Sequence, residues 1–207
     1  MSDENIVINE PDKNKKNSLL NDFTDLVESV IFSVYIVVLV FTFLFRIANV
    51  DGDSMQNTLH DGERLVISHL FYKPENGDIV IINDDTSHLL DSNGNVVEAQ
   101  GWDKVLVKRI IAVGGQTIDM DFENGKVYVD DKELSEPYIK ERMYLNAANP
   151  AFNYPITVPD GYVFVMGDNR NHSSDSRDAL VGLVPEDSIL GKVAFRIYPL
   201  KSFGKVE

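Results

Sequence analysis

The residues best suited to carry out chemistry in this chain are Ser54, Lys108 and Ser173, the last of which lies in a charged loop. Ser54 lies in a polar stretch from Val50 to Leu59, directly after a long apolar run. Gly52 can adopt backbone angles closed to other residues and Asp53 favours turns, so the sequence predicts that Ser54 is presented on a tight bend. This position suits a nucleophile, and it equally suits an ordinary surface turn.

Lys108 and Arg109 interrupt a predicted apolar strand from Val105 to Ile111. Because side chains alternate along a strand, the two cations point to opposite faces, and one of them must approach the core. Arginine keeps its proton in proteins whereas a buried lysine can lose it, so Lys108 is the candidate general base. An ordinary lysine has a pKa of about 10.4, and desolvation among apolar strand residues is the available means of lowering it. The alternative is that Lys108 extends to solvent or pairs with one of the many acids.

A polar loop from Gly167 to Arg177 follows another predicted strand. It contains two aspartate–arginine pairs with the same spacing, Asp168 with Arg170 and Asp175 with Arg177. Charge-assisted hydrogen bonds within such pairs can hold a loop rigid, which leaves Ser173 free to orient an amine. The alternative is a well-bonded surface loop without a role in chemistry.

An uncharged apolar run from Ser29 to Phe45 precedes the Ser54 stretch. Its length falls within the roughly 17 to 25 residues of a membrane-spanning helix, and extension to Ala48 matches a bilayer better. A buried core helix would normally keep a polar stripe, which this run lacks. A cleaved signal peptide would end in a small-x-small site, and none follows. We therefore expect a transmembrane anchor over residues 29–48.

The orientation of this anchor follows from the lysines on either side of it. Lys13, Lys15 and Lys16 precede the run, and no lysine follows it closely. The positive-inside rule then places residues 1–28, a tail and the start of the helix, in the cytoplasm. We expect a single-pass protein of the cell membrane, in contact with the lipid bilayer, whose larger part is extracellular.

Short β segments bounded by turn residues follow the anchor and predict a mainly β fold. The predicted strands are 65–68, 78–82, 105–113, 117–120, 126–129, 162–166 and 189–198. We expect an antiparallel β catalytic core over 49–115 and 160–207, with a small cap-like β subdomain inserted at 116–159. The polar segment 83–103 is expected to form a loop or a flexible hairpin outside the core.

Composition narrows the possible function classes. The net charge of −14 on 207 residues argues against nucleic-acid binding, which needs clustered Lys and Arg. The chain has no cysteine, so disulfides and thiolate chemistry are excluded. Its four histidines, His60, His69, His88 and His172, lack paired metal-ligand spacing. We expect neither a metal nor another cofactor.

Taken together, three motifs in this order behind an N-terminal anchor resemble the type I signal peptidases, membrane-anchored Ser-Lys proteases. The motifs are Gly52-Asp53-Ser54-Met55 with Thr58-Leu59, Val107-Lys108-Arg109-Ile110, and Gly167-Asp168-Asn169-Arg170 with Ser173, Asp175, Ser176 and Arg177. The resemblance extends from the anchor to about Tyr198. It implies cleavage of signal peptides from exported preproteins after small-x-small sites, through an acyl-enzyme.

The same resemblance implies roles for individual residues. Ser54 would be the nucleophile, Lys108 the general base and Ser173 a hydrogen-bond partner of the Lys108 amine, with Asp175 and Arg177 supporting the loop. By position, five residues are expected to line the substrate pockets, namely Val50, Met55, Leu59, Leu106 and Val107.

One position departs from the pattern of the Gram-negative members. They carry a hydroxyl residue two positions before the nucleophile, where it helps bind the oxyanion, and Gly52 stands there in this chain. This resembles the Gram-positive pattern. The Ser54 backbone N–H can still donate, and the second donor could be the Gly52 backbone or a water.

Two other functions remain open at this point. A self-cleaving Ser-Lys protease of the repressor type shares the catalytic pair but would need a DNA-binding domain, against which the anchor argues. A catalytically inactive membrane-anchored β domain could instead bind exported chains, and the presence of both Ser54 and Lys108 weighs against it.

Overall fold

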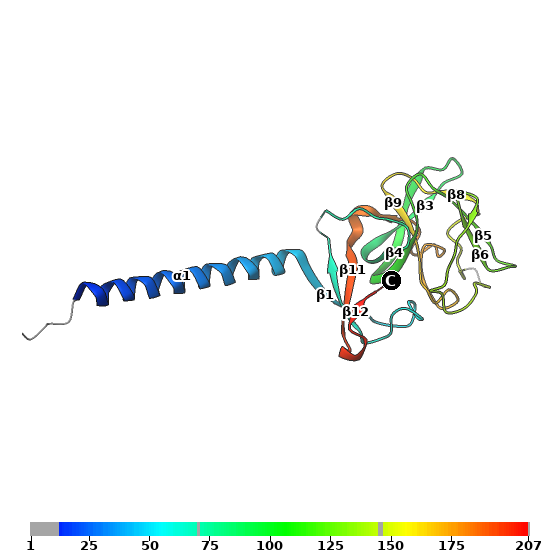
Figure 1. Ribbon diagram of the computed structural model, residues 1–207. Helices are drawn as coiled ribbons and strands as arrows, with labels where there is room; N and C mark the ends of the chain where they lie inside the picture. Colours follow the sequence, from blue (N-terminus) through cyan, green and yellow to red (C-terminus); the bar gives the residue numbers. More distant parts are fainter. Residues whose placement is uncertain (1–12, 70, 145–146, 207) are drawn as a thin grey trace, which may run out of the picture. The chain divides into compact units, whose positions relative to one another are not determined.

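The computed structural model describes residues 13–69, 71–144 and 147–206 (Figure 1). The first twelve residues of the expected tail lie outside this part of the chain. From Leu44 onward the chain forms one compact unit, and the preceding helix is described by itself.

Helix α1 extends over Lys13–Leu44. It contains most of the expected anchor, but it ends four residues before Ala48, because Phe45–Asn49 forms strand β1 and pairs with β2 (Arg64–Ser68). Phe45 and Ile47 are of residue types that favour strands, and pairing with β2 gives the backbone its hydrogen bonds there. None of the described helical segments combines the length and the hydropathy that crossing a lipid bilayer requires.

The compact unit is built on a main antiparallel sheet. Within the described residues the sheet has eight strands in the order β1-β2-β11-β3-β4-β9-β10, with β12 paired to β11. The remaining strands of this sheet are β3 (Ile79–Leu90), β4 (Val96–Val113), β9 (Tyr162–Met166), β10 (Val184–Pro185), β11 (Ile189–Tyr198) and β12 (Gly204–Lys205). Short 3₁₀ helices, η1 and η2, occupy Glu186–Ser188 and Leu200–Ser202.

A smaller antiparallel sheet lies within the range predicted for the inserted subdomain. It has the order β7-β6-β5-β8 among the described residues. Its strands are β5 (Thr117–Asp121), β6 (Lys126–Val129), β7 (Lys132–Glu133) and β8 (Ile156–Thr157). In Figure 1 the labelled strands of this sheet gather at the end of the unit opposite β1 and β12. The mainly β antiparallel architecture agrees with the sequence-based prediction.

The segment 83–103 forms a hairpin whose ladder has one bulge, at residues 101–103 opposite Asp85. Strands β3 and β4 remain paired from Ile79 with Arg109 up to Leu90 with Val96. The Asp91 carboxylate accepts the backbone N–H groups at the tip and so closes the turn. Residues 97–100 of this hairpin are exposed, as its polarity predicts. Ser87 and His88 are buried, and Leu89 and Leu90 pack against a core cluster, so the prediction that the whole segment lies outside the core was wrong.

The hydrophobic core next to the Ser54 stretch packs against three neighbouring strands of the main sheet, β2, β11 and β3. Its buried members are Val50, Met55, Leu59, Leu65, Ile67, Ile79, Ile81 and Val193. Met55 and Leu59 belong to the polar stretch itself, where they flank the polar residues 56–58. Burial of these two side chains anchors the bend that carries Ser54.

Candidate active site

The bend at Ser54 is fixed by its own backbone and by one carboxylate. Val50 donates its N–H to the carbonyl of Glu63, and Leu59 donates to the carbonyl of Met55. Gly52 has a φ of 87°, which a residue with a side chain rarely adopts, and its N–H donates to Asp61 Oδ1 at 2.9 Å. Ser54 is half-buried at the surface of this bend.

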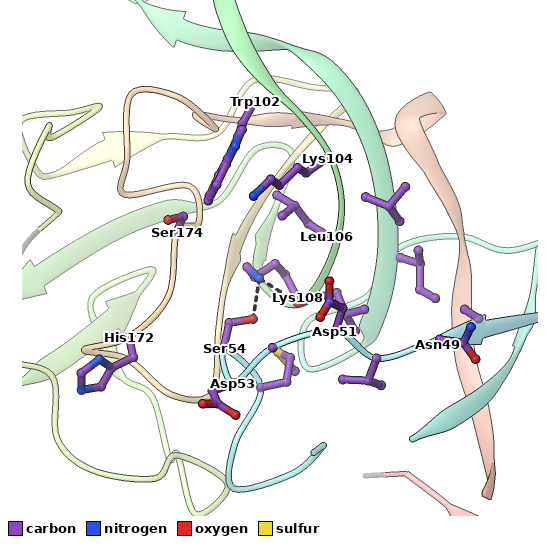
Figure 2. A pocket seen from close by; sticks show the side chains of 17 residues that line it. Asn49, Asp51, Asp53, Ser54, Trp102, Lys104, Leu106, Lys108, His172 and Ser174 are labelled. Atoms are coloured by element: carbon purple, nitrogen blue, oxygen red, sulfur yellow. Dashed lines mark hydrogen bonds between the residues drawn. The ribbon is translucent and has the colours of Figure 1, made fainter. Parts of the chain in front are cut away.

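Lys108 brings its amine to this serine from strand β4. The side chain is almost completely buried, at 2 % exposure. Its Nζ donates hydrogen bonds to Ser54 Oγ at 2.8 Å and to the carbonyl oxygen of Val107 at 3.0 Å (Figure 2). A nucleophile and a base must lie within about 2.6–3.2 Å of each other, and this pair does.

Burial changes the acidity of the Lys108 amine. Desolvation lowers the pKa of Lys108 from its ordinary 10.5 to about 8, while the charges of Asp175 and Asp168 raise it and that of Arg177 lowers it. Because desolvation dominates, an appreciable fraction of the amine is neutral near neutral pH. An amine in this state can accept the proton of a neighbouring hydroxyl.

Loop 167–177 is held by a buried ion pair between Asp175 and Arg177. Arg177 Nε and Nη2 donate to the Asp175 carboxylate at 2.8 Å each. The same carboxylate accepts the N–H of Gly167 at 3.0 Å. Burial alone would raise the pKa of Asp175, but the Arg177 charge and these hydrogen bonds lower it below its ordinary value. Asp175 is therefore ionised, and its hydrogen bonds to Gly167 and Arg177 hold the loop in one conformation.

Ser173 lies in this loop, but without the hydrogen bond expected of it. Its Oγ is buried and forms no hydrogen bond of normal geometry within the described residues, and the nearby hydroxyl contributes to lowering the pKa of Asp175. The Lys108 amine instead contacts Ser54 Oγ and the Val107 carbonyl. Orientation of the amine by Ser173 stays a prediction.

Asp168 and Arg170 do not form the ion pair that their spacing predicts. Asp168 accepts two hydrogen bonds from Arg109, at 2.9 and 2.8 Å, whereas Arg170 pairs with Glu136 at 2.5 Å. Arg109 also stacks on the ring of Tyr138, with 3.9 Å between its Cζ and the ring centroid. Lys108 and Arg109 are thus both buried. Arg109 is paired with the carboxylate of Asp168, whereas Lys108 forms no ion pair among the described residues.

Asn169 joins the loop to the Ser54 bend, and sequence reasoning missed it. Its backbone N–H donates to the Ser54 carbonyl oxygen at 2.9 Å, and its side-chain amide donates to the Asp53 carbonyl oxygen at 3.1 Å. Asn169 stands within the quoted motif, but nothing in its type or spacing indicates a contact with a bend so distant in sequence. These two hydrogen bonds fix the position of the Ser54 backbone relative to loop 167–177.

The backbone N–H of Ser54 is available as a donor to an oxyanion, whereas that of Gly52 is not. Gly52 donates its N–H to Asp61, so the Gly52 backbone is not a free second donor. No described residue accepts a hydrogen bond from the Ser54 N–H. The arrangement therefore offers the Ser54 N–H to a group outside the chain.

A groove of about 630 Å³ opens over Ser54 and Lys108. Four of the five residues predicted to bind substrate line it, namely Val50, Met55, Leu106 and Val107. Leu59 does not, because its side chain is completely buried in the core beneath the bend. Trp102, Lys104 and His172 line the groove as well, without having been predicted.

Comparisons with known proteins point to one family. The family model described as signal peptidase, peptidase S26, matches residues 23–198. A signal peptidase I of Bacillus licheniformis is 36 % identical over 205 residues, which cover 96 % of this chain and 98 % of the relative. A signal peptidase I of Bacillus amyloliquefaciens is 37 % identical over 186 residues, 86 % of this chain and 87 % of the relative. A crystal structure of a signal peptidase I from Enterococcus faecalis aligns with a TM-score of 0.39 at 26 % identity, over 58 % of this chain and 97 % of the other.

Proposed function

Because the chain belongs to the signal peptidase family, peptidase S26, it is a type I signal peptidase, a serine endopeptidase, and we propose that Ser54 and Lys108 are its catalytic pair. The observation that carries this proposal is the contact of 2.8 Å between the Ser54 hydroxyl and a buried amine whose pKa is lowered to about 8. A serine and a lysine in this relation are an established form of nucleophile and base.

The first half of the proposed reaction forms an acyl-enzyme. Ser54 Oγ attacks the scissile carbonyl carbon while neutral Lys108 takes the hydroxyl proton. The Ser54 N–H donates to the oxyanion that develops. When the tetrahedral intermediate collapses, the C–N bond breaks and the Lys108 ammonium returns its proton to the leaving amine.

The second half reverses these roles with water. Neutral Lys108 takes a proton from a water whose oxygen attacks the acyl carbon. The ester bond to Ser54 breaks, and the proton passes from Lys108 back to Ser54 Oγ. The carboxylic acid product leaves, and the enzyme returns to its starting state.

The substrates of this reaction are exported preproteins with signal peptides, which bind in an extended form. Strand β9 pairs with β4 only from Arg109 to Val113, so residues 104–107 have no strand partner on that edge among the described residues. A peptide strand can add to this edge through its backbone. Val50, Met55, Leu106 and Val107 line the groove there and leave shallow apolar space for small side chains one and three positions before the cut.

Residues 29–44 of α1 are proposed as the membrane anchor, with β1 starting the extracellular part. Support comes from the uncharged sequence and from large apolar side chains of the helix that are more than half exposed, including Val30, Ile31, Phe32 and Tyr35. Such side chains suit lipid contact. The three lysines before the run favour a cytoplasmic N-terminus, and confinement of enzyme and preprotein to one bilayer raises their effective concentration.

A cleavage assay tests the proposed function. The full chain in detergent is incubated with a preprotein that carries an Ala-x-Ala site, and the new N-terminus is determined by mass spectrometry. We expect one cut after the second alanine, its loss in Ser54→Ala and Lys108→Ala, and its retention in Lys132→Ala, which removes an exposed lysine of β7. Unchanged cleavage by either of the first two variants would refute the catalytic pair.

Substitution within the substrate tests the specificity separately. Phenylalanine in place of either alanine should abolish the cut, because the groove next to Ser54 is proposed to admit only small side chains. Equal rates with alanine and phenylalanine would contradict the proposed pockets and leave the catalytic pair untouched.

A further inference from the structure

The β3–β4 hairpin extends the groove beyond the residues that have been given a role. The base of the hairpin is hydrogen-bonded to the segment that follows loop 167–177. Trp102 donates its backbone N–H to the Leu180 carbonyl oxygen at 3.1 Å, and Leu183 donates to the His88 carbonyl oxygen at 2.8 Å. The hairpin backbone near Trp102 is therefore fixed relative to the active site.

Four side chains of β4 line the groove in succession. Because side chains alternate along a strand, Lys104 and Leu106 share the face that carries Lys108. Trp102 lies in a bulge of β4 opposite Asp85 and lines the same groove. Figure 2 shows these residues following one another along β4, and all four line the groove. Trp102 is half-buried and Lys104 is exposed.

A cation–π contact orders the outer two side chains. Lys104 Nζ lies 4.4 Å from the centroid of the Trp102 ring. This contact restrains the orientation of the indole and places the aliphatic stem of Lys104 beside it. The outer part of the groove thus offers aromatic and aliphatic surface next to one positive charge.

The proposed pockets indicate which part of the substrate reaches this surface. Leu106 lies between Lys108 and Lys104 and belongs to the apolar lining proposed for the small side chains before the cut. The substrate chain before the cut therefore extends from Lys108 toward Lys104. Asp53 and His172 lie on the other side of Ser54, where the chain after the cut would leave (Figure 2).

Strand geometry gives the position of the substrate residue. Neighbouring strands advance at the same rate of about 3.3 Å per residue. Lys108 is paired with Val80, and the bulge that contains Trp102 lies opposite Asp85, so the substrate residue beside Trp102 is about five positions from the one beside Lys108. In signal peptides the apolar region ends shortly before the small-x-small site. An apolar side chain is therefore the usual occupant at this distance from the cut.

We propose that Trp102 and the stem of Lys104 form an outer subsite that binds an apolar side chain about five or six residues before the cut. This inference rests on the proposed function and adds a specificity-determining contact to it. Both residues belong to the β3–β4 hairpin, for which the polar sequence did not indicate a function.

The test compares two otherwise identical preproteins, one with Leu and one with Asn at the sixth position before the cut, with the fifth position varied in the same way. For the full chain in detergent we expect kcat/KM to favour Leu by about 10-fold at one of these two positions, as is typical of one apolar contact. Trp102→Ala should reduce this preference to about 2-fold or less, whereas Trp102→Phe should keep most of it. Asp103→Asn changes an exposed neighbour that does not line the groove and is expected to keep all of it.

Three results would overturn the subsite. The preference for Leu could persist in Trp102→Ala, it could fall equally in Asp103→Asn, or the wild-type enzyme could show no preference at either position. If the Asn substrate is still cut at the proper site in these cases, the proposed function stands and only the subsite fails. If the wild-type enzyme cuts neither substrate, both proposals fail.

Discussion

The lowered pKa of Lys108 predicts how the activity depends on pH. If the neutral amine is the base, kcat/KM follows the neutral fraction of Lys108 and rises with a midpoint near pH 8. The sign follows from the mechanism, because protonation removes the lone pair that accepts the Ser54 proton. Activity is therefore lost as the pH falls below 8 and reaches a plateau above about 9.

The size of the increase in kcat/KM with pH distinguishes a Lys108 of lowered pKa from a lysine of ordinary pKa. With a pKa of about 8, the amine is about 9 % neutral at pH 7 and about 91 % neutral at pH 9, so kcat/KM should rise about 10-fold. With the ordinary pKa of about 10.5, the neutral fraction would rise about 100-fold over the same interval and continue to rise above pH 9.

The assay measures initial rates of the full chain in detergent at substrate concentrations below KM, from pH 6 to pH 10. The peptide substrate carries no group that titrates in this range, and circular dichroism at each pH excludes unfolding. A rate that stays level down to pH 6, or one that rises about 100-fold between pH 7 and pH 9, would refute the reasoning about the buried amine.

Two substitutions test the supports of the site. Asp168→Asn should lower the free energy of unfolding by about 3–5 kcal/mol, because it leaves the buried Arg109 guanidinium without its carboxylate, and urea unfolding that matches the wild-type protein would contradict this. Gly167→Ala should lower both stability, by about 1–3 kcal/mol, and kcat, because its Cβ would overlap the Ser54 carbonyl oxygen. Gly204→Ala adds a Cβ in open space and should change neither, so an equal effect of the two alanines would count against the close packing around Gly167.

Local patterns in the sequence predicted much of the fold. Strand alternation and turn residues predicted the strands at 65–68, 126–129, 162–166 and 189–198 at or close to their observed bounds, whereas the strand predicted at 105–113 begins nine residues earlier, at Val96. Motif order predicted the family, and the match over residues 23–198 confirms it. Such features depend on neighbouring residues, so one sequence is enough to find them.

Contacts between distant segments were beyond the reach of these patterns. The spacing of Asp168 and Arg170 predicted a local ion pair, yet Asp168 binds Arg109 from β4, because a planar guanidinium beside it in space gives two hydrogen bonds. Asn169 was missed for the same reason, since its partner at Ser54 is distant in sequence. The proximity of Ser54 and Lys108 was inferred from resemblance alone, as neither residue indicates the other.

The helix boundary and the Leu59 prediction show a second limit. Apolar residues fit a helix, a strand or a core, and tertiary pairing decides among them. Phe45 to Ala48 joined the sheet because β2 was available as a partner. Leu59 turned into the core under the bend and not into the groove.

Covalent capture of the enzyme tests the central claim most directly, namely that Ser54 is acylated with Lys108 as the base. The full chain is mixed with a peptide ester whose acyl part ends in Ala-x-Ala, quenched in acid within the first turnover, digested and analysed by mass spectrometry. We predict the acyl mass on the peptide that contains Ser54, none there in Ser54→Ala, and acylation slowed by at least about 100-fold in Lys108→Met. Acylation of a different residue, or an unchanged rate in Lys108→Met, would contradict the account.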